Sequence, residues 1–237
     1  MDHFNYRNGQ LYAEDVSVAE IAESVGTPFY VYSTATLVRH FQLFDDALKG
    51  MDHCICYAMK AASNQAILKT LGNLGAGMDV VSGGEYRRAI SAGIPPEKVV
   101  FSGVGKTLEE ITLALQNGIR QFNVESDSEL EKISSIASSM DKIAPIAIRI
   151  NPDVDAQTHE KIATGKAENK FGIPLSRARE VYSKASQLPG ISIMGIDLHI
   201  GSQLTELEPF KKAYQKLADL THILRQDGHK IKRLDLG

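Results

Sequence analysis

Short apolar runs alternate with amphipathic stretches along most of this chain. The runs are four to eight residues long and contain many β-branched residues, whereas the stretches between them repeat apolar positions with helical spacing. The pattern predicts strands over Cys54–Lys60, Gly77–Ser82, Val99–Gly103, Gln121–Val124, Ile146–Asn151, Met194–Ile200 and Arg233–Gly237. It predicts helices over Gln65–Leu74, Gly84–Ala92, Leu108–Asn117, Ser126–Ser139, Leu175–Gln187 and Pro209–Asp227. Glycines suited to helix C-termini follow four of them, at Gly75, Gly93, Gly118 and Gly228.

The predicted strands are apolar on both faces and are separated by helices, which is typical of a parallel sheet. Seven such units in succession favour a TIM-like (β/α)8 barrel over an open doubly wound sheet, so the expected class is α/β. Eight strands close a barrel of this kind, and the seventh predicted strand reaches the last residue. We therefore expect an incomplete barrel of about seven strands, from the N-terminal part of a longer protein.

Two segments depart from this alternation of strands and helices. The run Phe29–Ser33, after the turn Gly26-Thr27-Pro28, predicts a strand that precedes the barrel and does not fit its repeat. The stretch Asn151–Gly172 is a long polar connection, and connections of that length in a compact domain are usually functional or disordered.

Composition excludes several classes of protein. The chain has 43% hydrophobic residues, a formal net charge of −3 and no tryptophan, which argues against nucleic-acid binding. No apolar run approaches the roughly 18 residues of a membrane span, and the first residues lack the features of a signal peptide. Cys54 and Cys56 are two residues apart on one predicted strand, which is poor geometry for a disulfide, so the expected compartment is a reducing cytosol.

Lys60 is the first candidate for chemistry. It ends the apolar run Cys54–Ala58 and opens onto small residues. Burial there would lower the pKa of its ammonium, and a neutral amine attacks carbonyls, so Lys60 is a candidate Schiff-base lysine. The alternative is a lysine that extends from a strand end into solvent.

Other polar residues occupy corresponding strand ends. They are Asp79, Ser102, Glu125, Arg149 and His199. Individually they could be a strand-end cap (Asp79), half of an ion pair (Arg149) or a core histidine (His199), but together they predict an active site at one mouth of the barrel. The sequence Gly103-Val104-Gly105-Lys106-Thr107 lacks the first glycine of a phosphate-binding loop, and we find neither a dinucleotide fingerprint nor a zinc constellation.

Several motifs, in order, resemble those of a known family. They are Tyr57-Ala58-Met59-Lys60-Ala61, Gly77-Met78-Asp79-Val80-Val81-Ser82-Gly83-Gly84-Glu85, His199-Ile200-Gly201-Ser202-Gln203 and Leu234-Asp235-Leu236-Gly237. Together they resemble the fold type III, alanine-racemase-like decarboxylases that depend on pyridoxal phosphate. The resemblance extends from about residue 10 to the last residue.

The resemblance implies a set of roles around pyridoxal 5'-phosphate. Lys60 would carry the cofactor covalently, and the ring of His199 would stack on the pyridine. Ser202 and the turn beginning at Gly237 would hold the phosphate. Asp79 and Arg149 match positions near the cofactor, and no metal is expected.

The resemblance also implies a domain organisation and a partner. Residues 1–35 would contribute a strand to a C-terminal β-sandwich domain beyond this chain, and residues 36–237 would form the cofactor-binding barrel. The full-length protein would be a homodimer whose active sites are shared between subunits. Without the elements beyond Gly237, we expect residues 1–237 alone not to be an active decarboxylase.

The resemblance also implies a specific substrate. Asn151-Pro152-Asp153-Val154, followed by Thr158-His159, Lys161-Ile162, Thr164-Gly165 and Lys170-Phe171-Gly172, resembles members that convert meso-diaminopimelate to L-lysine and CO2. The alternatives are an ornithine- or arginine-type decarboxylase of the same fold, a single-domain pyridoxal-phosphate-binding protein of cofactor homeostasis, and a catalytically inactive relative acting as a regulatory partner.

Overall fold

Seven parallel strands form the central sheet of the computed structural model, which describes residues 2–154, 171–202 and 204–237. The strands are β4 (Cys56–Ala58), β5 (Gly77–Val80), β6 (Val99–Phe101), β7 (Gln121–Val124), β8 (Ala144–Asn151), β10 (Ile191–Asp197) and β11 (Arg233–Asp235). They are adjacent in chain order, from β4 at one edge to β11 at the other, and the short β9 (Ile173–Pro174) pairs with β8. The predicted incomplete TIM-like barrel of seven strands is confirmed.

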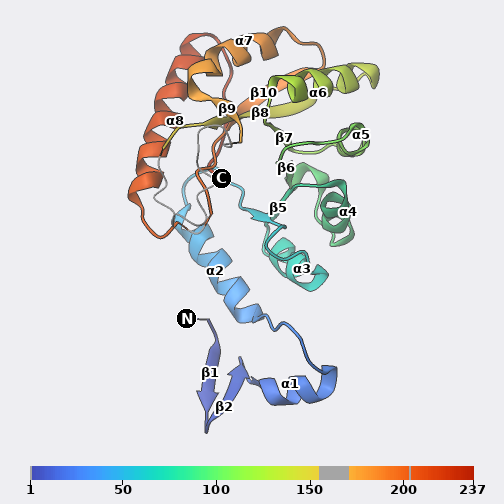
Figure 1. Cartoon of the computed structure of the whole chain (residues 1–237), viewed down its shortest axis with the longest axis vertical. Helices are drawn as coiled ribbons and strands as arrows, with labels where there is room; N and C mark the ends of the chain where they lie inside the picture. The colour runs from blue at the N-terminus through green and yellow to red at the C-terminus, as the bar shows by residue number, and fades with distance from the viewer. Residues whose placement is uncertain (1, 155–170, 203) are drawn as a thin grey trace.

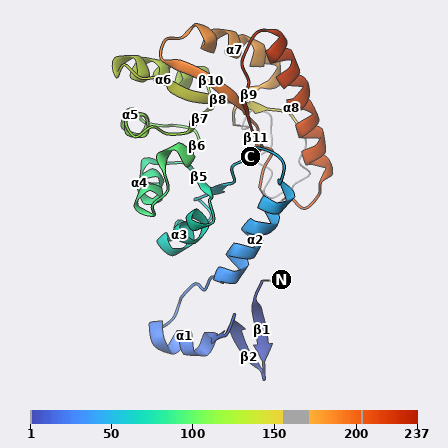
Figure 2. The ribbon, with the colours of Figure 1, turned by 180° about the vertical axis from the view of Figure 1, so that it is seen from behind.

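Helices connect successive strands and lie outside the curl of the sheet. They are α3 (Gln65–Asn73), α4 (Gly83–Ser91), α5 (Leu108–Gln116), α6 (Asp127–Ser139), α7 (Ala178–Gln187) and α8 (Glu208–Gln226), with 3-10 turns at Pro96–Lys98 and Leu175–Arg177. In Figure 1 and, from behind, in Figure 2, α3 to α8 trace an arc around the C-terminus. The four glycines predicted at helix ends all have positive φ, which glycine adopts without strain.

The core lies between the sheet and these helices. Phe101 and Phe122, on adjacent strands, are fully buried and stack with ring centroids 6.1 Å apart. Burying a side chain of this size stabilises the fold by about 1.5–3 kcal/mol. Cys54 and Cys56 are free thiols with sulfur atoms 3.9 Å apart, consistent with the predicted poor disulfide geometry. Among the helices of the described part of the chain, none has the length and apolarity needed to span a membrane.

A small N-terminal unit precedes the barrel (Figure 1). Strands β1 (Phe4–Arg7), β2 (Gln10–Ala13) and β3 (Val16–Ser17) form an antiparallel sheet, followed by α1 (Val18–Val25). The long helix α2 (Thr34–Ala47) then leads to the barrel, where it packs against α3. The sequence pattern missed all of these elements.

The segment Phe29–Ser33, predicted as a strand of a β-sandwich beyond these residues, forms no strand within this structure, so its role stays a prediction. A strand needs a partner to satisfy its backbone groups, and none of the strands in the described residues pairs with this segment. Tyr30 is 91% exposed, and Ser33 instead caps α2 by accepting a hydrogen bond from Thr36 N. The division at residue 35 stays a prediction, and residues 155–170 of the predicted connection lie outside the described residues.

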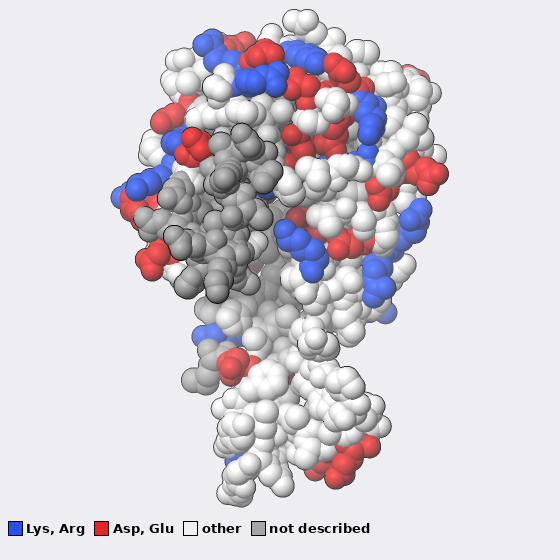
Figure 3. Space-filling model, in the orientation of Figure 1, with Lys and Arg blue, Asp and Glu red and all other residues white. Residues whose placement is uncertain are grey.

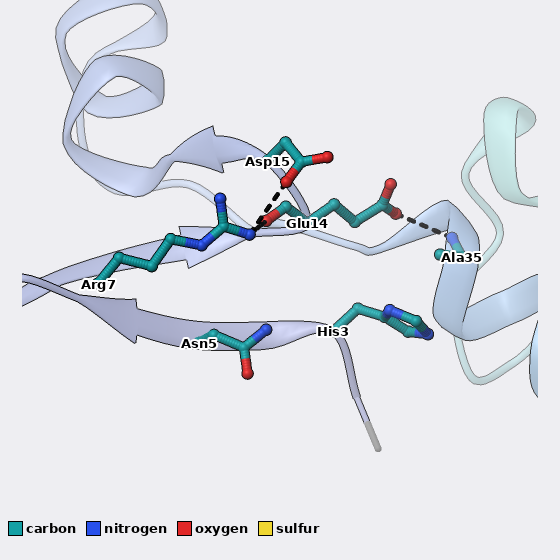
Figure 4. A pocket seen from close by; sticks show the side chains of 6 residues that line it. All are labelled: His3, Asn5, Arg7, Glu14, Asp15 and Ala35. Atoms are coloured by element: carbon teal, nitrogen blue, oxygen red, sulfur yellow. Dashed lines mark hydrogen bonds and ion pairs between the residues drawn. The ribbon is translucent and has the colours of Figure 1, made fainter.

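Glu14 connects the N-terminal sheet to α2. Its Oε1 accepts hydrogen bonds from Ser33 Oγ and Ala35 N, each at 2.8 Å, so a carboxylate lies at the positive end of the helix. The Ala35 and Ser33 hydrogen bonds lower the pKa of Glu14. Figure 4 shows Glu14 extended toward Ala35, while Arg7 turns to Asp15, at 3.0 Å.

Lys106, in the loop between β6 and α5, is buried rather than available to a phosphate. Its Nζ donates to Gly103 O at 2.6 Å, Asn123 O at 2.8 Å and Glu129 Oε1 at 3.0 Å, with 1% of the side chain exposed. This geometry fits the broken phosphate-loop motif, because all three donors of the ammonium have protein acceptors.

We expect Lys106→Ala to lower the free energy of unfolding by about 3–5 kcal/mol, since Glu129 would keep a buried charge without its partner. Denaturant unfolding would measure the loss, with the exposed Lys69→Ala as the matched control, expected within about 0.5 kcal/mol of wild type. Equal stability of the two variants would contradict this role for Lys106.

Candidate active site

Lys60 lies in the turn directly after β4, above the fully buried Met59. Met59 N donates to Asp79 O at 3.0 Å, which fixes this turn against the end of β5. The predicted burial of Lys60 is wrong, because β4 is an edge strand covered by a neighbour on one side and the side chain is exposed. Lys60 is therefore placed at the mouth, open to a ligand from solvent.

Asp79, on β5, faces the interior of the curl near Lys60. Burial raises the pKa of Asp79 to about 6, while a hydrogen bond with Ser102 and the charge of Lys60 lower it. Its Oδ1 is buried and has no hydrogen-bond partner among the described residues. A buried carboxyl oxygen without a partner normally marks a missing donor or a retained proton.

A hydrogen-bonded bridge crosses the interior below the mouth. Asn123 Nδ2, on β7, donates to Ser102 Oγ at 3.1 Å and to Asp235 Oδ2 of β11 at 3.0 Å. Asn123 Oδ1 accepts from Gln121 Nε2 at 2.8 Å. Sequence reasoning missed Asn123, although two polar residues at alternate positions of a buried strand indicate a polar layer on one face.

Arg149 is fixed at the end of β8. Its Nη1 is 2.7 Å from Glu125 Oε1, its Nε is 3.9 Å from Asp197 Oδ2, and its guanidinium lies over the ring of Phe171. The ion-pair alternative considered for Arg149 is therefore present, yet the guanidinium also adds positive charge near His199. Asp197, 3% exposed, is a second residue that the sequence analysis missed.

His199 follows β10 and is half-buried beside the end of the chain. Burial lowers the pKa of His199 to about 4, and the charges of Arg149 and Lys60 act in the same direction. Gly237 has φ of 87°, and a Cβ on it would lie 2.8 Å from His199 Nδ1. Only glycine permits this close approach of the backbone to the imidazole.

The structure gathers most of the predicted site residues at the carboxyl ends of the strands. Lys60 acts electrostatically on both Asp79 and His199, and Gly237 contacts His199. Ser202 directly follows Gly201 and is exposed, and its neighbour Gln203 lies outside the described residues. Acidic and basic side chains are interspersed over the face seen in Figure 3.

These side chains fit a phosphate-bearing aromatic aldehyde. An exposed amine can reach an aldehyde, a neutral imidazole can lie flat against a ring, and the hydroxyl of the exposed Ser202 can donate to a phosphate. The unpartnered Oδ1 of Asp79 adds a polar group that a ligand could engage. The donor set therefore matches pyridoxal phosphate better than a metal, and the described residues contain no cluster of three or more metal-ligating side chains.

Comparisons with known proteins agree with this chemistry. Residues 34–237 match the family model "Pyridoxal-dependent decarboxylase, pyridoxal binding domain". The chain is 54% identical to diaminopimelate decarboxylase of Haemophilus influenzae and 50% identical to that of Pseudomonas aeruginosa, each covering 100% of this chain and 57% of the relative. It thus spans little more than half the length of these curated relatives.

A solved structure gives the same likeness in three dimensions. The diaminopimelate decarboxylase of Helicobacter pylori, complexed with L-lysine, superposes with a TM-score of 0.88 at 43% identity. The alignment covers 92% of this chain and 56% of that one.

We expect His199 to stay neutral far below the usual range. A histidine with a lowered folded-state pKa contributes stability that is present above about pH 6.5 and is lost as the pH falls through about 4. NMR titration of the ring nitrogens would follow this, with His199→Gln identifying the signal. The variant should also lose less stability than wild type between these two pH values, and a midpoint near 6.5 would contradict the assignment.

Proposed function

The chain belongs to the pyridoxal-dependent decarboxylases, and on this premise we propose that the whole protein converts meso-diaminopimelate to L-lysine and CO2. The carrying observation is that all 237 residues align with diaminopimelate decarboxylases at about half identity while the candidate site gathers at one mouth. The L-lysine in the Helicobacter pylori structure supports the proposal, since lysine would be the product here.

Lys60 is the proposed nucleophile for the cofactor. Its amine stands in the turn after β4, exposed at the mouth, so the aldehyde of pyridoxal phosphate can reach it without a rearrangement of the core. When bound, the cofactor supplies an electron sink for the pair left on the α-carbon as CO2 departs. Lys60 would hold the reacting end of the cofactor beside Asp79.

His199 and Ser202 are the proposed supports of the ring and the phosphate. A neutral imidazole packs against the ring without adding a third positive charge to those of Lys60 and Arg149. Ser202 is the proposed phosphate contact through its hydroxyl, beside the turn that begins at Gly237. Arg149, held by Glu125 at 2.7 Å, would orient the negative groups that enter the mouth.

The alternatives concern the substrate and the assembly. Decarboxylases of ornithine or arginine would use the same lysine and histidine. Residues 158–172, the segment by which the sequence favours diaminopimelate over these substrates, lie largely outside the described residues. We further propose a cytosolic homodimer that shares its active sites and whose residues 1–35 join a β-sandwich domain. The aligned relatives, nearly twice as long as this chain, leave room for such a domain.

Replacing the proposed nucleophile tests the cofactor assignment. In the full-length protein, Lys60→Ala should abolish the visible absorbance of covalently bound pyridoxal phosphate, because its amine forms the bond. The exposed Lys69→Ala is the control and should keep the band. Borohydride reduction of wild type should label the peptide that contains Lys60, and a label found elsewhere would refute this role.

A comparison of substrates tests the proposed decarboxylation of meso-diaminopimelate. CO2 release by the full-length protein should be rapid with meso-diaminopimelate and at least about tenfold slower with ornithine or arginine, a difference of about 1.4 kcal/mol in transition-state binding. Efficient turnover of ornithine without turnover of diaminopimelate would leave the cofactor chemistry intact and overturn the substrate.

A further inference from the structure

Asp197 occupies an unusual place in the interior of the sheet. The strand register sets it directly opposite Arg149 of β8 on one side and Asp235 of β11 on the other. Only 3% of its surface is exposed. A carboxyl thus lies between a cation and a second carboxyl, inside the barrel and two residues before His199.

Carboxyl groups outnumber the cationic groups around Asp197. Among the described residues the interior wall holds the carboxyls of Asp79, Glu125, Asp197 and Asp235, which face the guanidinium of Arg149 and, at the mouth, the ammonium of Lys60. Glu125 takes the short contact to Arg149, at 2.7 Å, whereas Asp197 stands 3.9 Å away. Buried carboxylates this close cannot all ionise, so at least one must keep a proton.

The hydrogen bonds of Asp235 help to decide which of these carboxyls keeps the proton. Both oxygens of Asp235 accept from neutral donors, Oδ2 from Asn123 Nδ2 at 3.0 Å and Oδ1 from Gly237 N at 3.2 Å. Both carboxyl oxygens of Asp235 therefore already have a hydrogen-bond donor. Asp197 has the weaker contact with the cation and the deeper burial, so the proton belongs there.

We propose that Asp197 is a neutral positioning residue, whose retained proton leaves Arg149 paired with Glu125 and turned to the mouth beside His199. An ionised Asp197 would compete with Glu125 for the guanidinium and repel Asp235, whose contact with Gly237 N shapes the turn against His199. The role in cofactor binding rests on the proposed function, whereas the protonation state does not.

Apart from Arg149, the groups on the neighbouring elements favour the neutral form of Asp197. Burial and the charge of Asp235 raise the pKa of Asp197 well above its ordinary value, and the nearby carboxyls Glu125 and Asp79 add to the rise, against the opposite effect of Arg149. Tyr182 of α7 packs from outside, with its hydroxyl donating to Gly195 O at 2.8 Å. Burial raises the pKa of Tyr182, so it adds no charge there.

The change in stability with pH distinguishes a neutral Asp197 from an ionised Asp197 that forms a salt bridge with Arg149. An acid with a raised folded-state pKa contributes stability that is complete below its unfolded pKa, near 3.8, and is lost as the pH rises through the folded value. Asparagine has the same shape and cannot ionise. Asp197→Asn should therefore gain stability over wild type as the pH rises, whereas the loss of an Arg149 salt bridge would cost stability.

The first experiment measures melting temperatures of the full-length protein, free of cofactor, between about pH 5 and about pH 9. The melting temperature of Asp197→Asn should exceed that of wild type by a margin that widens with pH, while the exposed Asp219→Asn should follow wild type. A variant that melts below wild type with a widening gap, a gap independent of pH, or a variant that fails to fold would each overturn the proposal.

Two further readouts test the proton and the positioning. Isotope-edited infrared spectra with labelled aspartate should show a protonated carboxyl at neutral pH that is lost in Asp197→Asn and kept in Asp219→Asn; its absence in wild type would overturn the proposal. Asp197→Ala should weaken pyridoxal phosphate binding at least about tenfold and Asp197→Asn should restore most of it. Without rescue the positioning role fails, and inactivity toward diaminopimelate would count only against the proposed function.

Discussion

The shared direction of the strands is the constraint on which the rest of the structure depends. A helix returns the chain to the same edge after every strand, so all seven carboxyl ends of the central sheet meet at one mouth. Residues as distant in sequence as Lys60, Arg149 and His199 become neighbours because each follows or ends a strand. The site thus follows from topology before any individual contact is considered.

This topology also creates an electrostatic problem. The inner face of the curled sheet is poorly solvated, yet Asn123 and Asp197 are buried on it, and Asn123 donates there to Asp235. Their hydrogen bonds join strands far apart in the sheet order, and the pair Arg149–Glu125 supplies the central charge contact. Because breaking a buried pair leaves one charge uncompensated, the polar layer resists rearrangement and keeps the mouth rigid. Rigidity of this kind lets backbone and ring atoms be held against a cofactor.

The sequence predicted what periodicity and position along a strand determine. The seven strands, the six outer helices and the gathering of Asp79, Arg149 and His199 all follow from apolar pattern and topology. Interactions between distant residues escaped it: Phe29–Ser33 has strand-like composition but pairs with no strand among the described residues, and Lys60 lies at a sheet edge and is exposed. Asp197 was missed because one aspartate in an apolar strand gives no sign of the carboxyl that faces it from β11.

The neutral state of His199 depends more on packing than on its charged neighbours. Burial is the largest cause of its lowered pKa, and the charges of Arg149 and Lys60 are smaller contributions. An anion bound at the mouth would offset those two cations and so raise the pKa of the imidazole. Burial would persist and a ring stacked on it would deepen it, so the imidazole would stay neutral in the loaded site. The uncharged imidazole face available for the proposed ring stacking thus comes mainly from burial, and less from the charges around it.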